Sequence, residues 1–136
     1  MDLKTIIKEL WKAYGRYDWE QVGSYFCENA EIKWHDKNVK LTVSEFLKSN
    51  ENFSGLWENE IERLECIDNH VTSVTKVSGK FAESEEQFVY HVISFFKFQN
   101  GKIVELDEYW GRASHAPAWD TKFNIGSPIQ KMNSMI

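Results

Sequence analysis

The sequence predicts an α+β domain in which helices come first and an antiparallel sheet follows. Its 136 residues suffice for one hydrophobic core. Near the N-terminus the apolar residues recur at helical spacing, and from residue 56 they alternate with a period of two. Turn-forming residues interrupt this second part about every dozen residues, as in an antiparallel meander. Helices followed by strands indicate the α+β class, and the whole of 1–136 is expected to be one domain.

The first two helices are predicted from an apolar stripe and a capping signal. The stripe runs from Leu3 to Tyr14 with one residue every three or four positions, and Gly15 ends it. A second, shorter helix begins at Asp18, because an aspartate can cap a helix and Gln21 follows three residues later, as in a capping box.

A strand and a third helix follow. Residues 30–35 alternate and place Ile32 and Trp34 on one face, which indicates a strand. Thr42 and Glu45 form a second capping-box pattern, which predicts the start of the third helix.

Four longer strands are expected in the rest of the domain, at 56–67, 71–81, 88–98 and 103–110. Asn100-Gly101 is the strongest hairpin signal in the chain. From about residue 112 the sequence looks irregular and is expected to wrap over the domain.

The strand at 88–98 is apolar on both faces, so both faces should be covered. The helices can cover one of them, and a second copy of the chain is the simplest cover for the other. We therefore expect a homodimer through the outward face of the sheet, formed by Val89, His91, Ile93 and Phe95.

The composition is unusual in its aromatic content, with six Trp, five Tyr and nine Phe. Large aromatic residues fill dense cores and also line ligand cavities, and composition alone leaves both possibilities open. The net charge is −5 and no cluster of basic residues occurs, which argues against binding to nucleic acid or to anionic membranes.

Motifs for metals, cofactors and targeting are not found. Cys27 and Cys66 lack metal-ligand spacing and are expected to be reduced, buried thiols. No phosphate-binding glycine loop and no nucleophile elbow occurs, so no cofactor is expected. The N-terminus does not resemble a secretion signal and no apolar run is long enough to span a membrane, so a cytoplasmic location is expected.

The last strand contains the main candidate for chemistry, Glu108. Alternation places Glu108 on the more apolar face with Trp110, and Asp107 on the opposite face, so the two acids cannot act as a pair. Burial should raise the pKa of Glu108 into a range useful for a general base. The alternative is a structural anchor, held by an indole N–H, a tyrosine hydroxyl or Arg112.

Two further residues are candidates for catalysis. Tyr14 ends the stripe of the first helix, where its hydroxyl could donate to an oxyanion or simply belong to the core. His35 should face outward, and Asp36 could turn toward a pocket. The aromatic residues expected to contact a ligand are Trp34, Trp57, Tyr90, Phe96 and Trp110.

Several stretches resemble the SnoaL-like branch of the nuclear transport factor 2-like superfamily, in a bacterial subgroup whose members mostly have no assigned activity. They are residues 92–98, Asn100-Gly101, Leu106-Asp107-Glu108-Tyr109-Trp110-Gly111 and Ala116-Pro117-Ala118-Trp119. The resemblance implies a cystatin-like, cone-shaped sheet packed on three N-terminal helices. It also implies a deep apolar pocket and dimerisation through the sheet.

The superfamily includes polyketide cyclases and a ketosteroid isomerase, which use pocket carboxylates as bases, and also proteins that only bind. By position, Glu108 matches a pocket acid of the enzymes, Tyr14 an oxyanion donor, and Asp36 lies near the place of the isomerase base. The cyclase acid is typically an aspartate, whereas the inward acid here is a glutamate. Two functions stay open: binding of a small apolar or aromatic molecule, and proton abstraction next to a carbonyl by Glu108.

Overall fold

The computed structural model describes residues 1–129 and confirms the α+β class. The helices are α1 (Leu3–Gly15), α2 (Trp19–Ser24), α3 (Val43–Asn52) and α4 (Ala118–Thr121). The strands are β1 (Phe26–Trp34), β2 (Val39–Leu41), β3 (Gly55–Ile67), β4 (His70–Phe81), β5 (Gln87–Gln99) and β6 (Lys102–Arg112).

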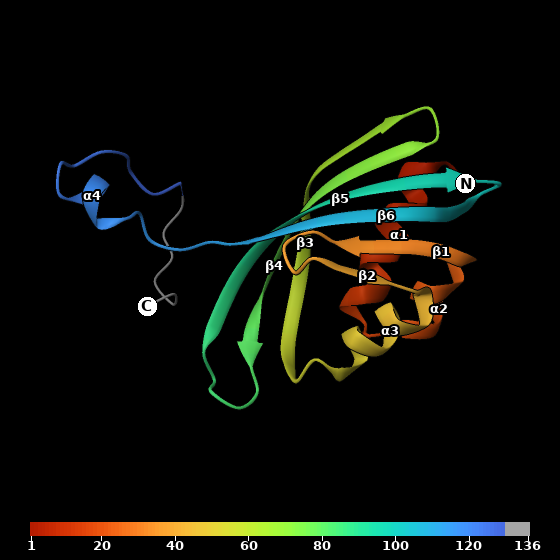
Figure 1. The fold of residues 1–136 in the computed structure, drawn as a ribbon, viewed down its shortest axis with the longest axis horizontal. Helices are drawn as coiled ribbons and strands as arrows, with labels where there is room; N and C mark the ends of the chain where they lie inside the picture. Colours follow the sequence, from red (N-terminus) through yellow and green to blue (C-terminus); the bar gives the residue numbers. More distant parts are fainter. Residues whose placement is uncertain (130–136) are drawn as a thin grey trace.

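All six strands belong to one curved, unclosed sheet in the order β2-β1-β6-β5-β4-β3 (Figure 1). The expected meander is confirmed, since β3 to β6 pair antiparallel with their neighbours in sequence. One pair differs from the antiparallel expectation: β1 lies parallel to β6. This pair joins the N-terminal part of the domain to the last strand.

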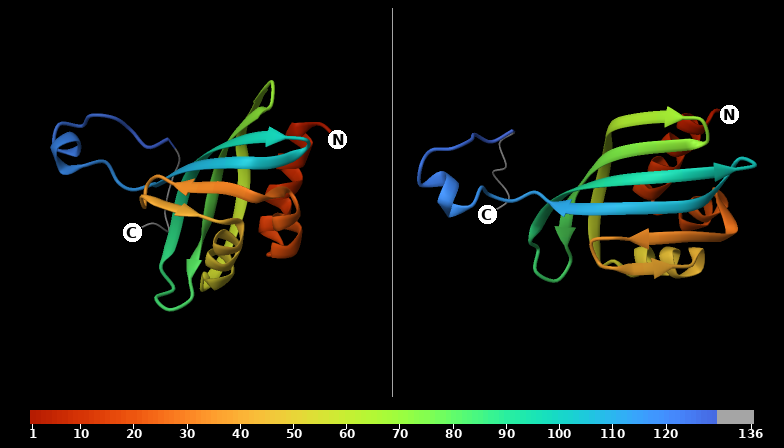
Figure 2. Two further views of the ribbon diagram at one scale, coloured as in Figure 1. Left: turned by 45° about the vertical axis from the view of Figure 1, so that its right-hand side comes forward. Right: turned by 45° about the horizontal axis from the view of Figure 1, so that its top comes forward.

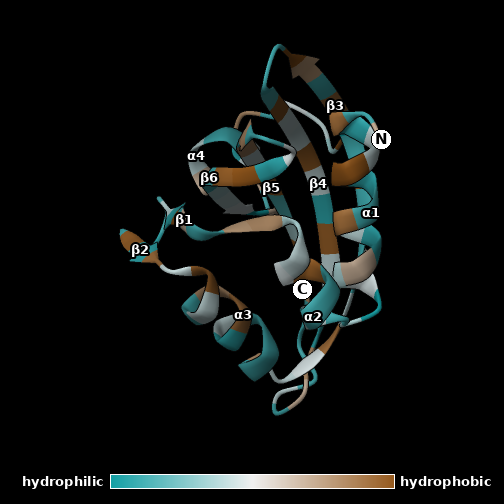
Figure 3. Cartoon of the chain, turned by 90° about the vertical axis from the view of Figure 1, so that its right-hand side faces the viewer, coloured by the Kyte–Doolittle hydropathy of each residue, from teal (hydrophilic) through white to brown (hydrophobic). Residues whose placement is uncertain are grey.

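The first three helices lie on the same side of the sheet, which curves around them (Figures 1 and 2). Helix α1 packs on β3 and β4, α3 packs on β1 and β2, and α2 lies between the other two helices. Apolar residues of α1 lie beside β4 (Figure 3). The core between the two layers includes the fully buried Ile7 and Leu10 of α1.

The helix starts follow the predicted caps. Thr42 and Glu45 form a complete capping box at α3. At α2 the Asp18 side chain accepts a hydrogen bond from the backbone N–H of Gln21, but the Gln21 side chain bonds Arg16 and Tyr25 instead of returning to the cap. The capping box predicted for Asp18 and Gln21 is therefore only half formed.

A β-bulge in β6 changes one expected position. Phe98 of β5 lies opposite Ile103, whereas Lys97 lies opposite Glu105, so β6 carries one extra residue. Counted back from Asp107 by simple alternation, Ile103 would lie on the outward face. Because of the bulge, Ile103 is fully buried, and the alternation expected for Leu106 to Trp110 holds beyond it.

The C-terminal tail does not wrap over the domain as expected. Beyond β6, residues 113–129 extend past the end of the sheet, and α4 contacts no other helix or strand of the described part (Figure 1). Trp119 and Phe123 are exposed there. Residues 130–136 of the predicted tail lie outside the described residues.

Two other expectations concern thiols and membranes. Both cysteines are free, but Cys27 is only half-buried and Cys66 is exposed. Cys66 is exposed because it lies near the end of β3, which is an edge strand of the sheet. The prediction of buried thiols was therefore wrong. None of the described helices is both long and apolar enough to cross a membrane.

The outward face of β5 is partly exposed. Ile93 and Phe95 retain 39% and 45% of their accessible surface, and Tyr109 of the neighbouring β6 retains 44%. Val89 and His91 are half-buried. The face is thus available for a second copy of the chain, and the dimer itself stays a prediction.

Gly79 allows β4 to approach β3 closely next to two aromatic residues. A Cβ atom at this position would lie 2.2 Å from the Leu56 carbonyl oxygen, 2.8 Å from the Trp57 Cα and 2.8 Å from the Phe88 ring. Two of these neighbours are backbone atoms, so the strands would have to separate to admit a side chain.

We predict that Gly79→Ala lowers the free energy of unfolding by about 2 kcal/mol, because the added methyl group forces β3 and β4 apart. Chemical denaturation measures the effect. Gly111→Ala is the matched control, since Gly111 also lies in a strand but a Cβ atom added there would meet no other atom within 4 Å. Equal stabilities of the two variants would contradict the role of Gly79.

Candidate functional site

A cavity of about 340 Å³ lies between the inner face of the sheet and the helices α1 and α3. Ten of its sixteen lining residues are aromatic, so its wall is mostly apolar ring surface. These ten are Trp11, Tyr14, Trp34, Phe46, Phe53, Trp57, Phe81, Phe88, Tyr90 and Trp110. The other six are Asp36, Lys37, Ser49, Asn50, Val77 and Glu108.

Glu108 is the buried acid of this wall and is 2% exposed. One carboxylate oxygen, Oε1, accepts hydrogen bonds from the indole N–H groups of Trp34 at 3.0 Å and Trp110 at 3.4 Å. The other, Oε2, lies 2.6 Å from the Ser94 hydroxyl. Trp34 and Ser94 lie directly opposite Glu108 on the two neighbouring strands, so the strand register assembles this group.

Burial raises the pKa of Glu108 above its usual value, because the ionised form loses its hydration. The three hydrogen bonds oppose this increase, since they stabilise the carboxylate, and the negative charge of Asp36 adds to it. Because the pKa of Glu108 is higher in the folded state than in the unfolded state, this residue stabilises the folded state at pH values below its unfolded-state pKa. This contribution is lost as the pH rises through the folded pKa.

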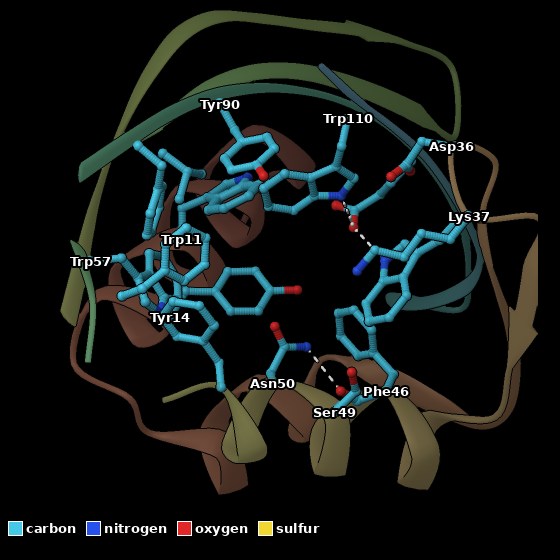
Figure 4. A pocket seen from close by; sticks show the side chains of 16 residues that line it. Trp11, Tyr14, Asp36, Lys37, Phe46, Ser49, Asn50, Trp57, Tyr90 and Trp110 are labelled. Carbon is cyan, nitrogen blue, oxygen red and sulfur yellow. Dashed lines mark hydrogen bonds between the residues drawn. The ribbon is translucent and has the colours of Figure 1, made fainter. Parts of the chain in front are cut away.

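Tyr14 lies across the cavity from this carboxylate. Figure 4 shows its hydroxyl pointing into the space between the walls. Its ring packs between Trp11 and Phe46, with centroid distances of 4.8 and 6.3 Å. Burial and the charge of Glu108 raise the pKa of Tyr14 well above its usual value, so the hydroxyl stays protonated and can donate a hydrogen bond.

Polar residues surround the opening of the cavity. Asp36, Lys37 and Ser49 are exposed, and Asn50 is half-buried. The Lys37 ammonium lies 4.8 Å from the centroid of the Trp34 ring. The Asn50 side chain donates to the Phe46 carbonyl oxygen at 2.8 Å, which leaves its own oxygen toward the cavity (Figure 4).

The structure brings together most residues that the sequence singled out. Glu108, Tyr14 and Asp36 all line the cavity. Four of the five expected ligand contacts do so too: Trp34, Trp57, Tyr90 and Trp110. Phe96 does not. It lies on the same face of β5, but between Val71 and Leu106, and it belongs to the buried core.

Several residues of the site were missed from the sequence. Ser94 lay on the predicted inward face, and a buried hydroxyl among apolar neighbours was the signal that it had a polar partner. Lys37, Ser49 and Asn50 gave no such signal, because they belong to a turn and a helix surface. The Phe residues at positions 46, 53, 81 and 88 could not be told from ordinary core residues.

The remaining candidates lie elsewhere. As expected, His35 faces outward, where its Nε2 lies 2.7 Å from Asp107 and its ring stacks on Tyr109. Arg112, one possible anchor for Glu108, bonds Glu86 instead. Among residues 1–129, no group of three or more His, Cys, Asp and Glu side chains could hold a metal ion.

We predict that Trp34→Phe raises the pKa of Glu108 further, because the carboxylate loses an N–H donor that stabilises its ionised form. The measurement is an NMR titration of the Glu108 carboxyl carbon. Trp57→Phe serves as the control, since Trp57 lines the same cavity but has no hydrogen bond to Glu108. A pKa that is the same in both variants would refute the proposed effect of the Trp34 indole.

No family model and no curated protein sequence matches the chain. Solved structures match its fold over most of its length. A protein from Kribbella flavida, predicted to be a ketosteroid isomerase, has a TM-score of 0.74 at 14% identity and covers 93% of this chain and 90% of its own. An NTF-2 like protein of unknown function from Burkholderia xenovorans has a TM-score of 0.67 at 16% identity, with 95% and 94% covered.

A third structure comes from Shewanella putrefaciens and is predicted to be a SnoaL-like polyketide cyclase. Its TM-score is 0.69 at 12% identity, and the match covers 81% of this chain and 80% of that one. Likeness at this level of identity establishes the fold alone. The chain therefore has the nuclear transport factor 2-like fold that SnoaL-like and ketosteroid isomerase-like proteins share.

Proposed function

We propose that the chain binds a small, largely apolar molecule in the aromatic cavity and that Glu108 orients the ligand's polar group. The observation that supports this function is the placement of one buried acid in a cavity whose wall is mostly aromatic. Ligand sites typically combine apolar walls with a few polar groups that fix orientation. The cavity volume of about 340 Å³ lies within the range of such sites.

The energetics also favour a ligand over an empty core defect. Water in this cavity would meet mainly ring surface, so a ligand that replaces it gains roughly 25 cal/mol for each Å² of apolar surface removed from water. The exposed residues at the opening provide an entry path.

A second function, general-base catalysis, is favoured by the position of Tyr14. Glu108 and Tyr14 line the same cavity, and the Tyr14 hydroxyl points into it. With a carbonyl compound bound between them, Glu108 would remove a proton from the carbon next to the carbonyl. Tyr14 would then donate a hydrogen bond to the enolate oxygen. The names of the Kribbella and Shewanella proteins point to isomerases and cyclases on this fold, which supports the possibility.

We predict that the bicyclic ketone 1-indanone binds the wild-type chain and binds Ser49→Trp at least about tenfold more weakly, because the indole would block the opening. Isothermal titration calorimetry measures both affinities. Lys48→Trp is the control: it adds the same side chain to the neighbouring exposed position of α3, which does not line the cavity. Equal binding to all three proteins would place the ligand elsewhere.

For the second function, we predict that the wild-type chain accelerates hydrogen–deuterium exchange next to the carbonyl of 1-indanone in heavy water. Glu108→Gln should slow this exchange roughly a hundredfold by removing the base, and Tyr14→Phe should slow it by removing the donor. Proton NMR follows the exchange. If the wild-type chain binds the ketone and does not accelerate its exchange, the cavity only binds.

A further inference from the structure

Resting on the proposed function, the structure points to a more specific ligand class: we infer that the cavity takes a protonated amine attached to a flat apolar body. Glu108 would pair with the ammonium group, and the aromatic walls would enclose the remainder. Three features of the site support this inference, namely its charge balance, the unused hydrogen-bonding capacity of Glu108 and the ring surfaces around the carboxylate.

The charge balance inside the cavity is negative. Five titratable residues line it: Tyr14, Asp36, Lys37, Tyr90 and Glu108. Burial and the charge of Glu108 raise the pKa of Tyr14, so its hydroxyl is neutral. Asp36 and Lys37 are neighbours at the exposed opening and carry opposite charges. Glu108 is thus the buried charge, and its partners Trp34, Ser94 and Trp110 are all neutral. In the described part of the chain, 1–129, no cationic side chain pairs with this buried acid, which favours a ligand that supplies a cation.

The carboxylate of Glu108 also has one unused hydrogen-bond acceptor site. An ionised carboxylate can accept about four hydrogen bonds. Among residues 1–129, the two indoles occupy Oε1 and the Ser94 hydroxyl occupies one site on Oε2, which leaves one site on Oε2 unused. An ammonium N–H can fill it with a charge-assisted hydrogen bond. A ketone has no N–H or O–H group of its own with which to fill this site.

The ring surfaces suit a cation as well. Trp34 and Trp110 donate to the carboxylate through their N–H edges and also line the cavity, and Tyr90 packs against Trp110 with a centroid distance of 5.9 Å. Aromatic faces attract ammonium groups, most strongly where water is excluded. The chain itself provides an example, because the Lys37 ammonium lies over the Trp34 ring at the opening.

The experiment compares two ligands that differ in charge and hardly in shape. 1-Aminoindane carries an ammonium group at neutral pH, and 1-methylindane carries a methyl group in the same place. We expect the wild-type chain to bind the amine at least about tenfold more tightly, by calorimetry at about pH 7.5. The amine should bind more weakly as the pH is lowered, because protons compete for Glu108, while the binding of methylindane should not change.

Glu108→Gln is the matched variant, since glutamine keeps the shape and an oxygen acceptor but removes the charge. In this variant the amine should bind no more tightly than methylindane, and retained methylindane binding would show that the cavity is intact. If the wild-type chain binds methylindane as tightly as the amine, the ligand class is wrong and the proposed binding function stands. If neither compound binds, both fail.

Discussion

The hydrogen bonds of one buried carboxylate connect the strands that form the wall of the cavity. Glu108 lies on β6, Trp34 on β1 and Ser94 on β5, and these three strands are neighbours in the sheet. A carboxylate at 2% exposure is costly unless donors surround it, and here each donor comes from a residue whose place is set by the strand register. The sheet geometry and the chemistry of the cavity therefore depend on each other.

This dependence explains why the cavity can stay open. A cavity lined only by apolar side chains gains stability when its walls collapse onto it. Trp34 and Trp110 are held by their N–H groups to Glu108, and Asn50 by its bond to the Phe46 carbonyl oxygen, so these side chains cannot simply rotate inward. The polar contacts thus preserve the shape of a largely apolar space, which lowers the cost of ordering a ligand in it.

Local patterns in the sequence predicted much of the fold and part of the site. Alternation placed Glu108 inward and Asp107 outward, since the side-chain direction within a strand needs no knowledge of its neighbours. The same rule failed at Ile103, because a bulge depends on the partner strand. It also could not separate Tyr90, which lines the cavity, from Phe96, which is packed in the core. Register and cavity depth are properties of the assembled sheet, and only structure reveals them.

The parallel pairing of β1 with β6 has a consequence for how the molecule folds. Trp34 and Glu108 are 74 residues apart, so the loop between them must close before their hydrogen bond can form. Contacts this distant along the chain slow folding and form late. During synthesis, the N-terminal helices leave the ribosome long before β6 exists. Until then their apolar stripes lack part of the sheet on which they pack. The cavity is therefore among the last features to form, and a nascent chain that stops short of β6 lacks it entirely.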